Sequence, residues 1–280
     1  MHRAVHNGAM NKDTSSIPSP ALADLAPGSV WLVGAGPGDP GLLTLLAARA
    51  LAQADVVVFD ALVDTRILDL INPDAERIFA GKRGGRPSAS QDDISSQLVT
   101  LARDGKRVAR LKGGDPCVFG RGGEEALALA RANIPFRIVP GITAGVGALA
   151  YAGIPATHRD AGAAITFITG HASGGNVPDN LDWQALAGGS PTLVFYMALS
   201  HLGRICAALR DAGRAGDEPV AVICKATTPA QSVLVTTLER AEADARTAAL
   251  KPPALIVVGP IVRFRDELAW FEKLAGAGAD

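Results

Sequence analysis

Short apolar runs alternate with amphipathic segments along the first half of the chain. Val30–Val33 and Val56–Phe59 are apolar throughout, which predicts strands buried on both faces, as in a parallel sheet covered by helices. Residues 42–54 lie between them and predict a helix with Thr44 near its start. This alternation favours a parallel sheet whose crossover connections are right-handed.

The same alternation continues as far as residue 139. Ser90 precedes a helical repeat of apolar residues in a capping-box pattern, and Gly105 supplies a stop signal for that helix. The other elements predicted here are a helix at 65–71, strands at 77–79, 107–111 and 136–139, and a helix at 124–132.

The second half of the chain has a different pattern. Strands are predicted at 165–169, 192–196, 220–224, 231–236 and 254–258, with helices at 201–212 and 238–250. Only a short segment separates the strands at 220–224 and 231–236, which favours an antiparallel hairpin and therefore a mixed sheet.

The predicted fold class is α/β, with two α/β domains that meet near 157–162. The N-terminal domain, 29–160, carries the parallel sheet and the C-terminal domain, 161–270, carries the mixed sheet. Residues 1–28 are rich in Ala, Ser, Asn and Pro and are expected to be a disordered tail, and 271–280 a flexible one.

Composition narrows the class of protein. With 280 residues and 48% hydrophobic content, the chain can bury a large core, and its formal net charge of −1 lacks the basic excess of a nucleic-acid binder. No apolar signal segment begins the chain, and the uncharged stretch 138–157 is interrupted by Gly and Pro, so no membrane span is expected. Three cysteines without a CxxC pair favour reduced thiols and a cytoplasmic location. The five histidines lack metal-ligand spacing, so no metal is expected.

Two glycine-rich turns follow predicted strands. They are Gly34-Ala35-Gly36-Pro37-Gly38-Asp39-Pro40 and Lys112-Gly113-Gly114-Asp115-Pro116. Ligands of open α/β sheets bind beyond the carboxyl ends of the strands, and glycine lets a ligand approach the backbone closely. Asp115 could accept hydrogen bonds from ribose hydroxyls or from an amine.

A dinucleotide site is the main alternative for the first turn. Its Gly-Ala-Gly follows a strand, and Asp60 ends the next strand. However, Asp39 stands where the third glycine of GxGxxG belongs, and Pro37 and Pro40 remove two N–H donors that a pyrophosphate needs. The pattern therefore favours a cofactor without a pyrophosphate.

These turns and several further motifs resemble the uroporphyrinogen-III C-methyltransferases, within the tetrapyrrole methylase family. The resemblance runs from about Ser29 to Phe264, and it is to the single-function form without a preceding dehydrogenase domain. The other matching motifs are 58–63, Gly81-Lys82-Arg83, Phe119-Gly120-Arg121-Gly122-Gly123-Glu124-Glu125, 140–144 and Pro155-Ala156-Thr157-His158-Arg159.

The resemblance implies a cofactor, S-adenosylmethionine, bound in a cleft between two domains and released as S-adenosylhomocysteine, in a homodimer. The residues it implies for the cofactor are Pro37, Gly113, Gly114, Asp115, Val118, Thr143, Ala144, Met197 and Ala226. The chain departs from the family pattern at Gly41, Ala198 and Cys224-Lys225.

The resemblance also implies catalytic and substrate-binding residues. Asp60 would accept a proton and Lys82 would donate one; Arg121 remains an alternative base, although its high pKa makes that costly. The implied substrate is a polycarboxylate, for which guanidinium groups are suited, and the residues implied are Arg121, Glu124, Arg159 and Arg83.

The activity implied is two methylations of uroporphyrinogen III, at C2 and C7, giving precorrin-2 through precorrin-1. Two other classes remain open: a nicotinamide oxidoreductase, and a tetrapyrrole or nucleotide binder without catalysis. Relatives that act on later corrin intermediates, translation factors or ribosomal RNA are also alternatives, and the neutral charge weakens the RNA option. Whether the product leads to siroheme, cobalamin or haem d1 also stays open.

Overall fold

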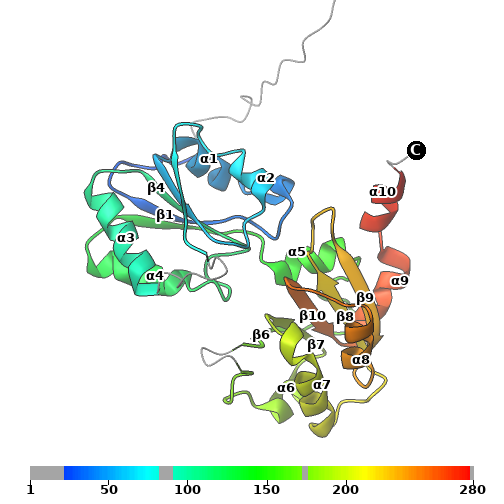
Figure 1. Cartoon of the computed structure of the whole chain (residues 1–280). Helices are drawn as coiled ribbons and strands as arrows, with labels where there is room; N and C mark the ends of the chain where they lie inside the picture. The colour runs from blue at the N-terminus through cyan, green and yellow to red at the C-terminus, as the bar shows by residue number, and fades with distance from the viewer. Residues whose placement is uncertain (1–21, 82–90, 172–175, 278–280) are drawn as a thin grey trace, which may run out of the picture.

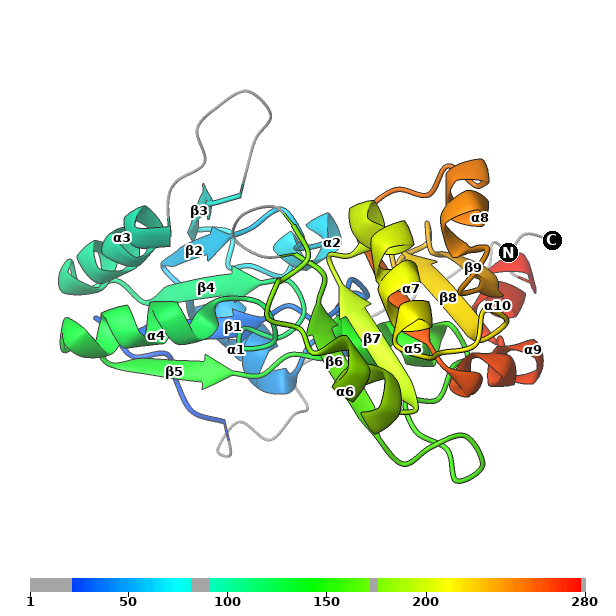
Figure 2. The same cartoon turned by 90° about the horizontal axis from the view of Figure 1, so that it is seen from below.

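The chain folds around two five-stranded sheets (Figure 1). The computed structural model describes residues 22–81, 91–171 and 176–277. The first sheet has the order β3-β2-β4-β1-β5 and the second has the order β6-β7-β10-β8-β9. Figure 2 shows the two sheets side by side, each with its own helices.

All strands of the N-terminal sheet are parallel, as predicted. The strands are β1 (Val30–Gly34), β2 (Val56–Phe59), β3 (Glu76–Phe79), β4 (Val108–Lys112) and β5 (Phe136–Val139). The helices between them are α1 (Leu45–Gln53), α2 (Thr65–Leu68), α3 (Gln91–Arg103) and α4 (Gly122–Arg131).

Alternate residues of each central strand enter different cores. Val33 and Val57 pack with α1 and α2, whereas Leu32 and Val58 pack with α3 and α4. All four are completely buried, and each such side chain stabilises the fold by about 1.5–3 kcal/mol. Burial of both faces explains why β1 and β2 are apolar at every position.

Two predicted helix boundaries are confirmed by their hydrogen bonds. Thr44 caps α1, because its hydroxyl accepts the Ala47 N–H at 3.1 Å. Gly105 has φ +77° and ends α3. The helix predicted at 65–71 ends earlier, at Leu68, because the Leu70 N–H turns to the carbonyl of Ile67, three residues back.

The C-terminal sheet is mixed, as predicted. β6 and β7 are parallel, and β7, β10, β8 and β9 follow one another antiparallel. The strands are β6 (Ile165–Thr169), β7 (Thr192–Tyr196), β8 (Pro219–Cys224), β9 (Ser232–Thr237) and β10 (Ala254–Val258). The helices are α5 (Ala144–Tyr151), α6 (Trp183–Gly189), α7 (Leu202–Asp211), α8 (Ala241–Thr247), α9 (Arg265–Leu268) and α10 (Phe271–Ala277).

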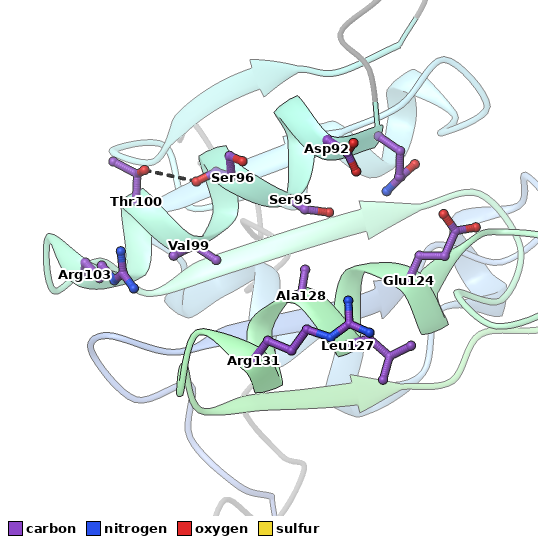
Figure 3. Close-up of a pocket in the computed structure, with 11 residues that line it drawn as sticks. Asp92, Ser95, Ser96, Val99, Thr100, Arg103, Glu124, Leu127, Ala128 and Arg131 are labelled. Carbon is purple, nitrogen blue, oxygen red and sulfur yellow. Dashed lines mark hydrogen bonds between the residues drawn. The ribbon is translucent and has the colours of Figure 1, made fainter.

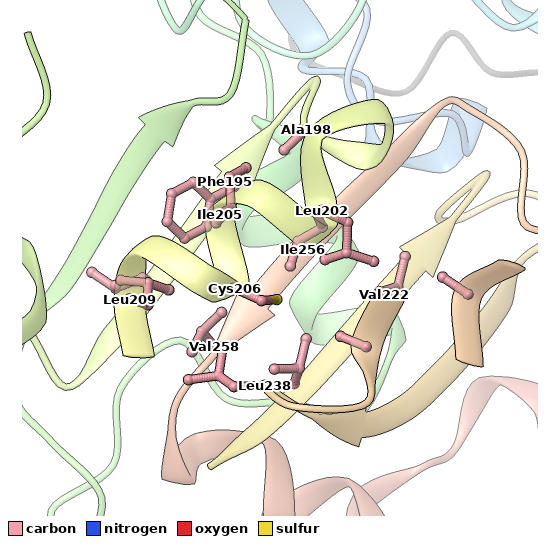
Figure 4. Packing of buried hydrophobic residues seen from close by; sticks show 14 of the residues in the cluster. Phe195, Ala198, Leu202, Ile205, Cys206, Leu209, Val222, Leu238, Ile256 and Val258 are labelled. Carbon is pink, nitrogen blue, oxygen red and sulfur yellow. The ribbon is translucent and has the colours of Figure 1, made fainter. Parts of the chain in front are cut away.

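One face of this sheet is covered by α6, α7 and α8. Ile205 and Leu209 of α7 pack on Phe195 of β7, together with Val222 and Ile256 (Figure 4). The opposite face is covered by α5, whose Ala148 and Leu149 enter one cluster with Val194, Tyr196 and Val257.

Helix α5 therefore packs with the second sheet, although the sequence pattern assigned residues 29–160 to the first domain. Ala148, Leu149 and Ala152 are fully buried in the cluster of the C-terminal sheet. An almost uniformly apolar helix has no polar face to indicate which sheet it covers, so only the tertiary contacts decide this.

The segments outside the predicted domains contain ordered contacts. Leu25 is buried against the α1 side of the first sheet, and Asp24 pairs with Arg49, so the packed region begins before residue 29. Residues 271–277, assigned from the sequence to a flexible tail, form α10. Residues 1–21 and 278–280 lie outside the described residues. Within the described part of the chain, none of the helices has the length and apolar character that a membrane crossing requires.

Candidate functional site

A cavity of about 1040 Å³ lies where loops of both domains meet. It is lined from the N-terminal domain by Pro37, Gly38 and the segment 61–64, and from the C-terminal domain by residues of β7, β8 and the loops after them. Asp64 and Lys225 are the charged side chains among its lining residues, and the rest of the lining is mostly apolar. The site therefore suits a ligand with a large uncharged body.

Three glycine-containing turns touch one another beside this cavity. Gly36 and Gly114 exchange two backbone hydrogen bonds, of 3.1 and 2.7 Å. A Cβ on Gly141 would collide with the Gly114 carbonyl and with Gly34. Glycine is required here because no side chain fits between the backbones, and the result is a compact surface formed by main chain.

Asp115 links two of these turns. Its Oδ1 accepts the Cys117 N–H at 2.8 Å and its Oδ2 accepts the Gly141 N–H at 3.0 Å. Each carboxylate oxygen keeps a lone pair for another donor, so the residue can still serve a ligand.

Tyr196 holds the start of α5 at the cavity. Its hydroxyl accepts the Gly145 N–H at 2.6 Å and lies 2.7 Å from Thr143 Oγ1. Burial raises the pKa of the Tyr196 phenol, which keeps it neutral. Tyr196 thus places Thr143 and Ala144, two of the residues that the resemblance implies for the cofactor.

The residues implied for the cofactor are brought together. Pro37, Ala144, Met197 and Ala226 line the cavity. The remaining residues lie next to these, as follows: Gly113 against Leu62 of the lining, Gly114 against Thr143 and Ala144, and Val118 in one cluster with Ala144 and Ala226.

Several non-glycine residues beside the cavity have left-handed backbone conformations. Phe119, Arg121, Met197, Lys225 and Thr227 have φ between +46° and +62°. Such conformations cost free energy for residues with a Cβ and persist where the surrounding contacts impose them, commonly at ligand sites. Two of these residues, Met197 and Lys225, are themselves part of the lining.

Asp60 directly follows β2 and precedes the lining segment 61–64. Its Oδ1 accepts the Leu62 N–H at 3.1 Å, and its Oδ2 lies 3.8 Å from the Arg110 guanidinium. Gly81 packs against Ala61, so the Gly81-Lys82-Arg83 motif starts beside Asp60. Lys82 and Arg83 themselves lie outside the described residues.

Arg121 and Glu124 form an exposed pair at the start of α4. Two hydrogen bonds, of 2.9 and 2.6 Å, join them. This pairing raises the pKa of Arg121 and lowers that of Glu124, so both stay charged. The ring of Phe119, two residues before Arg121, lies tilted against that of Tyr196 with 4.9 Å between the centroids, so the loop that leads to Arg121 contacts a residue of the cavity lining.

Arg159 is not brought to the cavity by its own chain. It lies in the turn between His158 and Gly162, and Gly162 packs on Pro191, directly before β7. Met197 lies beyond the other end of β7, whose five residues at about 3.3 Å each span roughly 16 Å. The sequence placed Arg159 at the rim of the cleft, but in the fold it lies at the end of β7 opposite to Met197.

Tyr196 was not singled out from the sequence. Lys225 was noted there only as a departure from the family pattern, and in the fold it lines the cavity. Asp39 was noted only as a break in the dinucleotide pattern, and in the fold its Oδ2 accepts the Tyr151 hydroxyl at 2.7 Å. Tyr196 carried a usable signal, because it is a polar-tipped aromatic residue at the end of an apolar strand. The partner of Asp39 is 112 residues away and no local pattern indicates it.

A second hollow, of about 610 Å³, lies between α3 and α4 (Figure 3). Glu124 and Asp92 lie toward one end of it and Arg103 and Arg131 toward the other. It contains none of the glycine turns and no residue implied for the cofactor, so the interdomain cavity is the better candidate. Among the described residues, no group of three or more His, Cys, Asp or Glu is arranged to hold a metal ion.

A parallel α/β domain, a mixed α/β domain and a cavity between them, with glycine turns beside it, define a class of two-domain α/β proteins with an interdomain cofactor site. Residues 29–242 match the family described as "Tetrapyrrole (Corrin/Porphyrin) Methylases". The chain belongs to this family.

Individual relatives agree with this assignment. The chain is 63% identical, over 91% of both sequences, to a uroporphyrinogen-III C-methyltransferase of Sinorhizobium sp. It is 53% identical to a siroheme synthase of Pseudomonas fluorescens, covering 88% of this chain and 53% of that longer protein.

Solved structures show the same fold. Uroporphyrin-III C-methyl transferase from Thermus thermophilus, complexed with S-adenosylhomocysteine, superposes with a TM-score of 0.73 at 40% identity, over 84% of this chain and 99% of that one. The cobalt precorrin-4 methyltransferase CbiF superposes with a TM-score of 0.75 at 28% identity, covering 84% of this chain and 96% of that one. These matches support the predicted fold of two α/β domains.

Proposed function

We propose that this protein transfers methyl groups from S-adenosylmethionine to C2 and C7 of uroporphyrinogen III, giving precorrin-2 through precorrin-1. The observation that carries the proposal is the convergence of the residues implied for the cofactor on one cavity beside Asp60. The similarity to methyltransferases of this substrate supports it.

The cavity fits this cofactor. Its volume of about 1040 Å³ leaves room for cofactor and part of a second ligand, and its mostly apolar lining suits an adenosyl group. The backbone turns at Gly36, Gly114 and Gly141 allow close approach of polar ligand atoms. The cofactor-binding residues we propose are Pro37, Gly113, Gly114, Asp115, Val118, Thr143, Ala144, Met197 and Ala226.

For this reaction the protein must align the methyl donor with the acceptor carbon, exclude water, and accept one proton from the ring. Adenosylmethionine supplies an electrophilic methyl group on a sulfonium ion. The apolar lining keeps water from the reacting atoms, and the rigid turns align donor and acceptor. For each methyl group transferred, the ring loses one proton, which Asp60 accepts. A proton that Lys82 donates to the ring during the reaction must return to Lys82, so that the net loss stays at one proton.

Guanidinium groups bind the carboxylates of the substrate. Arg121, held by Glu124, presents a charged group near Phe119. Arg83 lies outside the described residues, two positions after Gly81 in the sequence. Because Arg159 lies at the far end of β7, its role in substrate binding requires a second copy of the chain to bring it to the cavity.

We therefore propose a homodimer, and we place it in the cytoplasm. From the sequence its domains are 29–160 and 161–270, whereas in the fold α5 packs with the second sheet. Support for the dimer comes from Leu127, Phe136 and Ile138, which are 56%, 39% and 38% exposed on α4 and the edge strand β5. Sedimentation equilibrium should give about twice the chain mass of 28.7 kDa, and Ile138→Lys should weaken association. A monomer at all concentrations contradicts the dimer and, with it, the role of Arg159.

The test of the function is incubation with uroporphyrinogen III and adenosylmethionine, followed by mass spectrometry. A product heavier by two methyl groups is expected. Its absence overturns the substrate, and tight NAD(P)H binding without adenosylmethionine binding in a calorimetric titration overturns the class of enzyme.

A further inference from the structure

A closed group of charged side chains lies beneath Asp60. Glu125 of α4 is completely buried, and its Oε1 accepts hydrogen bonds from Arg110 Nε at 3.1 Å, Lys112 Nζ at 3.0 Å and Gln91 Nε2 at 3.0 Å. Arg110 and Lys112 are only 3% and 4% exposed. We call Glu125, Arg110, Lys112 and Gln91 the Glu125 cluster.

Packing alone does not explain the Glu125 cluster. Moving ions out of water costs more free energy than a buried pair usually returns, and apolar side chains of similar size stabilise a core at least as well. Glu125 Oε2 adds to this cost, because it is buried without a hydrogen-bond partner among the described residues. A group that is costly in this way and lies beside a reacting residue is expected to act on that residue.

Arg110 connects the Glu125 cluster to Asp60. Arg110 Nε donates to Glu125, and Arg110 Nη1 donates to the carbonyls of Val58 and Leu111. The remaining nitrogen, Nη2, lies 3.8 Å from Asp60 Oδ2. The guanidinium is planar and its donors are fixed relative to one another, so orienting one edge orients the other.

We propose that Glu125 is a positioning residue: it holds the Arg110 guanidinium against Asp60 and so aims a charged carboxylate at the substrate. This inference rests on the proposed role of Asp60 as proton acceptor. Among the described residues, the hydrogen-bond partners of Glu125 are Gln91, Arg110 and Lys112, none of which lines the cavity. Glu125 therefore acts on Asp60 through Arg110 and through its own negative charge.

The charges around the cluster determine what a neutral residue at 125 does. The groups that face it are Arg110 and Lys112 of β4, Asp60 after β2, Asp92 of α3, and Arg121 and Glu124 at the start of α4. Arg110, Lys112, Asp60 and Glu125 sum to zero, so removing the negative charge of Glu125 leaves a net charge of +1. Burial and the neighbouring Arg110 already lower the pKa of Lys112.

The experiment compares Glu125→Gln, Glu125→Leu and Asp60→Asn with Glu267→Gln, which removes an exposed carboxylate on α9. Glu125→Gln keeps an acceptor for Arg110 but withdraws the negative charge near Asp60. The acid limb of the pH profile of kcat/KM should therefore move down by roughly half to one pH unit. Glu125→Leu leaves Arg110 without that acceptor, and kcat should fall at least about ten-fold with the Kd of S-adenosylhomocysteine changed less than about two-fold. Glu267→Gln should match the wild type in both measurements.

The outcomes separate the two proposals. An unshifted acid limb in Glu125→Gln overturns the positioning role, and this test stands even if Glu125→Leu does not fold. Wild-type kcat in Glu125→Leu overturns it too. Wild-type turnover in Asp60→Asn instead removes the proposed role of Asp60, whatever Glu125 does.

Discussion

Asp60 and Arg121 lie beside the cavity without being among its lining residues. Substitution of either residue is therefore expected to lower turnover without weakening cofactor binding. Asp60→Asn should lower turnover by about 10²- to 10⁴-fold, the range for loss of a proton acceptor. Arg121→Ala should also lower turnover, because a carboxylate of the substrate loses its guanidinium partner. Both variants should keep S-adenosylhomocysteine affinity within about two-fold of wild type. Product mass spectrometry and calorimetry measure the two quantities. Arg240→Ala, in an exposed ion pair on α8, is the control, and equal losses of cofactor binding and turnover would make the residues structural.

Alkylation of Cys117 can be used to detect ligand binding at the Gly113-Gly114-Asp115 turn. Cys117 is exposed, and its N–H donates to Asp115, whereas Cys206 and Cys224 are buried. Burial raises the pKa of Cys206 to about 11, so that thiol stays protonated and unreactive. We expect iodoacetamide to alkylate one thiol, and saturating S-adenosylhomocysteine to slow that reaction at least about five-fold. Mass spectrometry counts the labelled thiols; Cys117→Ser should remove the fast site, and an unprotected Cys117 would place the cofactor elsewhere.

The start of α5 depends on close contact with β7. A Cβ on Gly145 would collide with the Tyr196 hydroxyl, which accepts the Gly145 N–H. Gly145→Ala should lower the free energy of unfolding by about 1–3 kcal/mol, as overpacking does, and weaken S-adenosylhomocysteine binding at least about ten-fold because Thr143 shifts. Urea unfolding and calorimetry measure these effects.

Gly188→Ala is the matched control for that substitution. Gly188 lies in α6, and a Cβ there meets no atom within 4 Å. Alanine should leave binding unchanged and stabilise the helix by about 0.5–1 kcal/mol. If Gly145→Ala behaves like Gly188→Ala, the Tyr196 contact does not position the helix.

Asp39 joins both domains and the C-terminal helices. Its carboxylate accepts the Tyr151 hydroxyl and its N–H donates to Thr227 Oγ1, while Tyr151 packs on Trp270 and Phe271. The acidic residue that breaks the dinucleotide pattern is thus an internal hydrogen-bond acceptor. Phosphate at this position would compete with these bonds and be repelled by the charge.

The Asp39–Tyr151 bond makes stability depend on pH in the alkaline range. Burial and then Asp39 raise the pKa of Tyr151 from 10.0 to about 12. Because the folded-state pKa is raised, the stabilisation is complete below pH 10 and is lost as pH rises through about 12. Wild type should exceed Tyr151→Phe in the free energy of unfolding by about 1 kcal/mol at pH 8, and the difference should disappear by pH 12. Urea titrations of both proteins check this, and a constant difference between pH 8 and 12 contradicts it.

The strands and the glycine turns could be predicted from the amino-acid sequence alone. Apolar runs such as Val56–Phe59 need no partner to be recognised, because burial on both faces leaves no polar position. Glycine turns can be recognised equally well, since Gly36 and Gly114 have positive φ values of +72° and +68°, which glycine adopts without strain. The motifs around them were sufficient to indicate the family.

Which elements and side chains contact one another became clear only from the folded chain. The tertiary structure placed α5 on the second sheet, put Arg159 at the far end of β7, and enclosed Glu125 with Arg110 under Asp60. None of these follows from a local pattern, because a uniformly apolar helix fits either sheet and a charged residue looks the same in sequence whether it is solvated or buried. Each depends on contacts between segments distant in sequence or in different layers, which are defined only when both cores are packed.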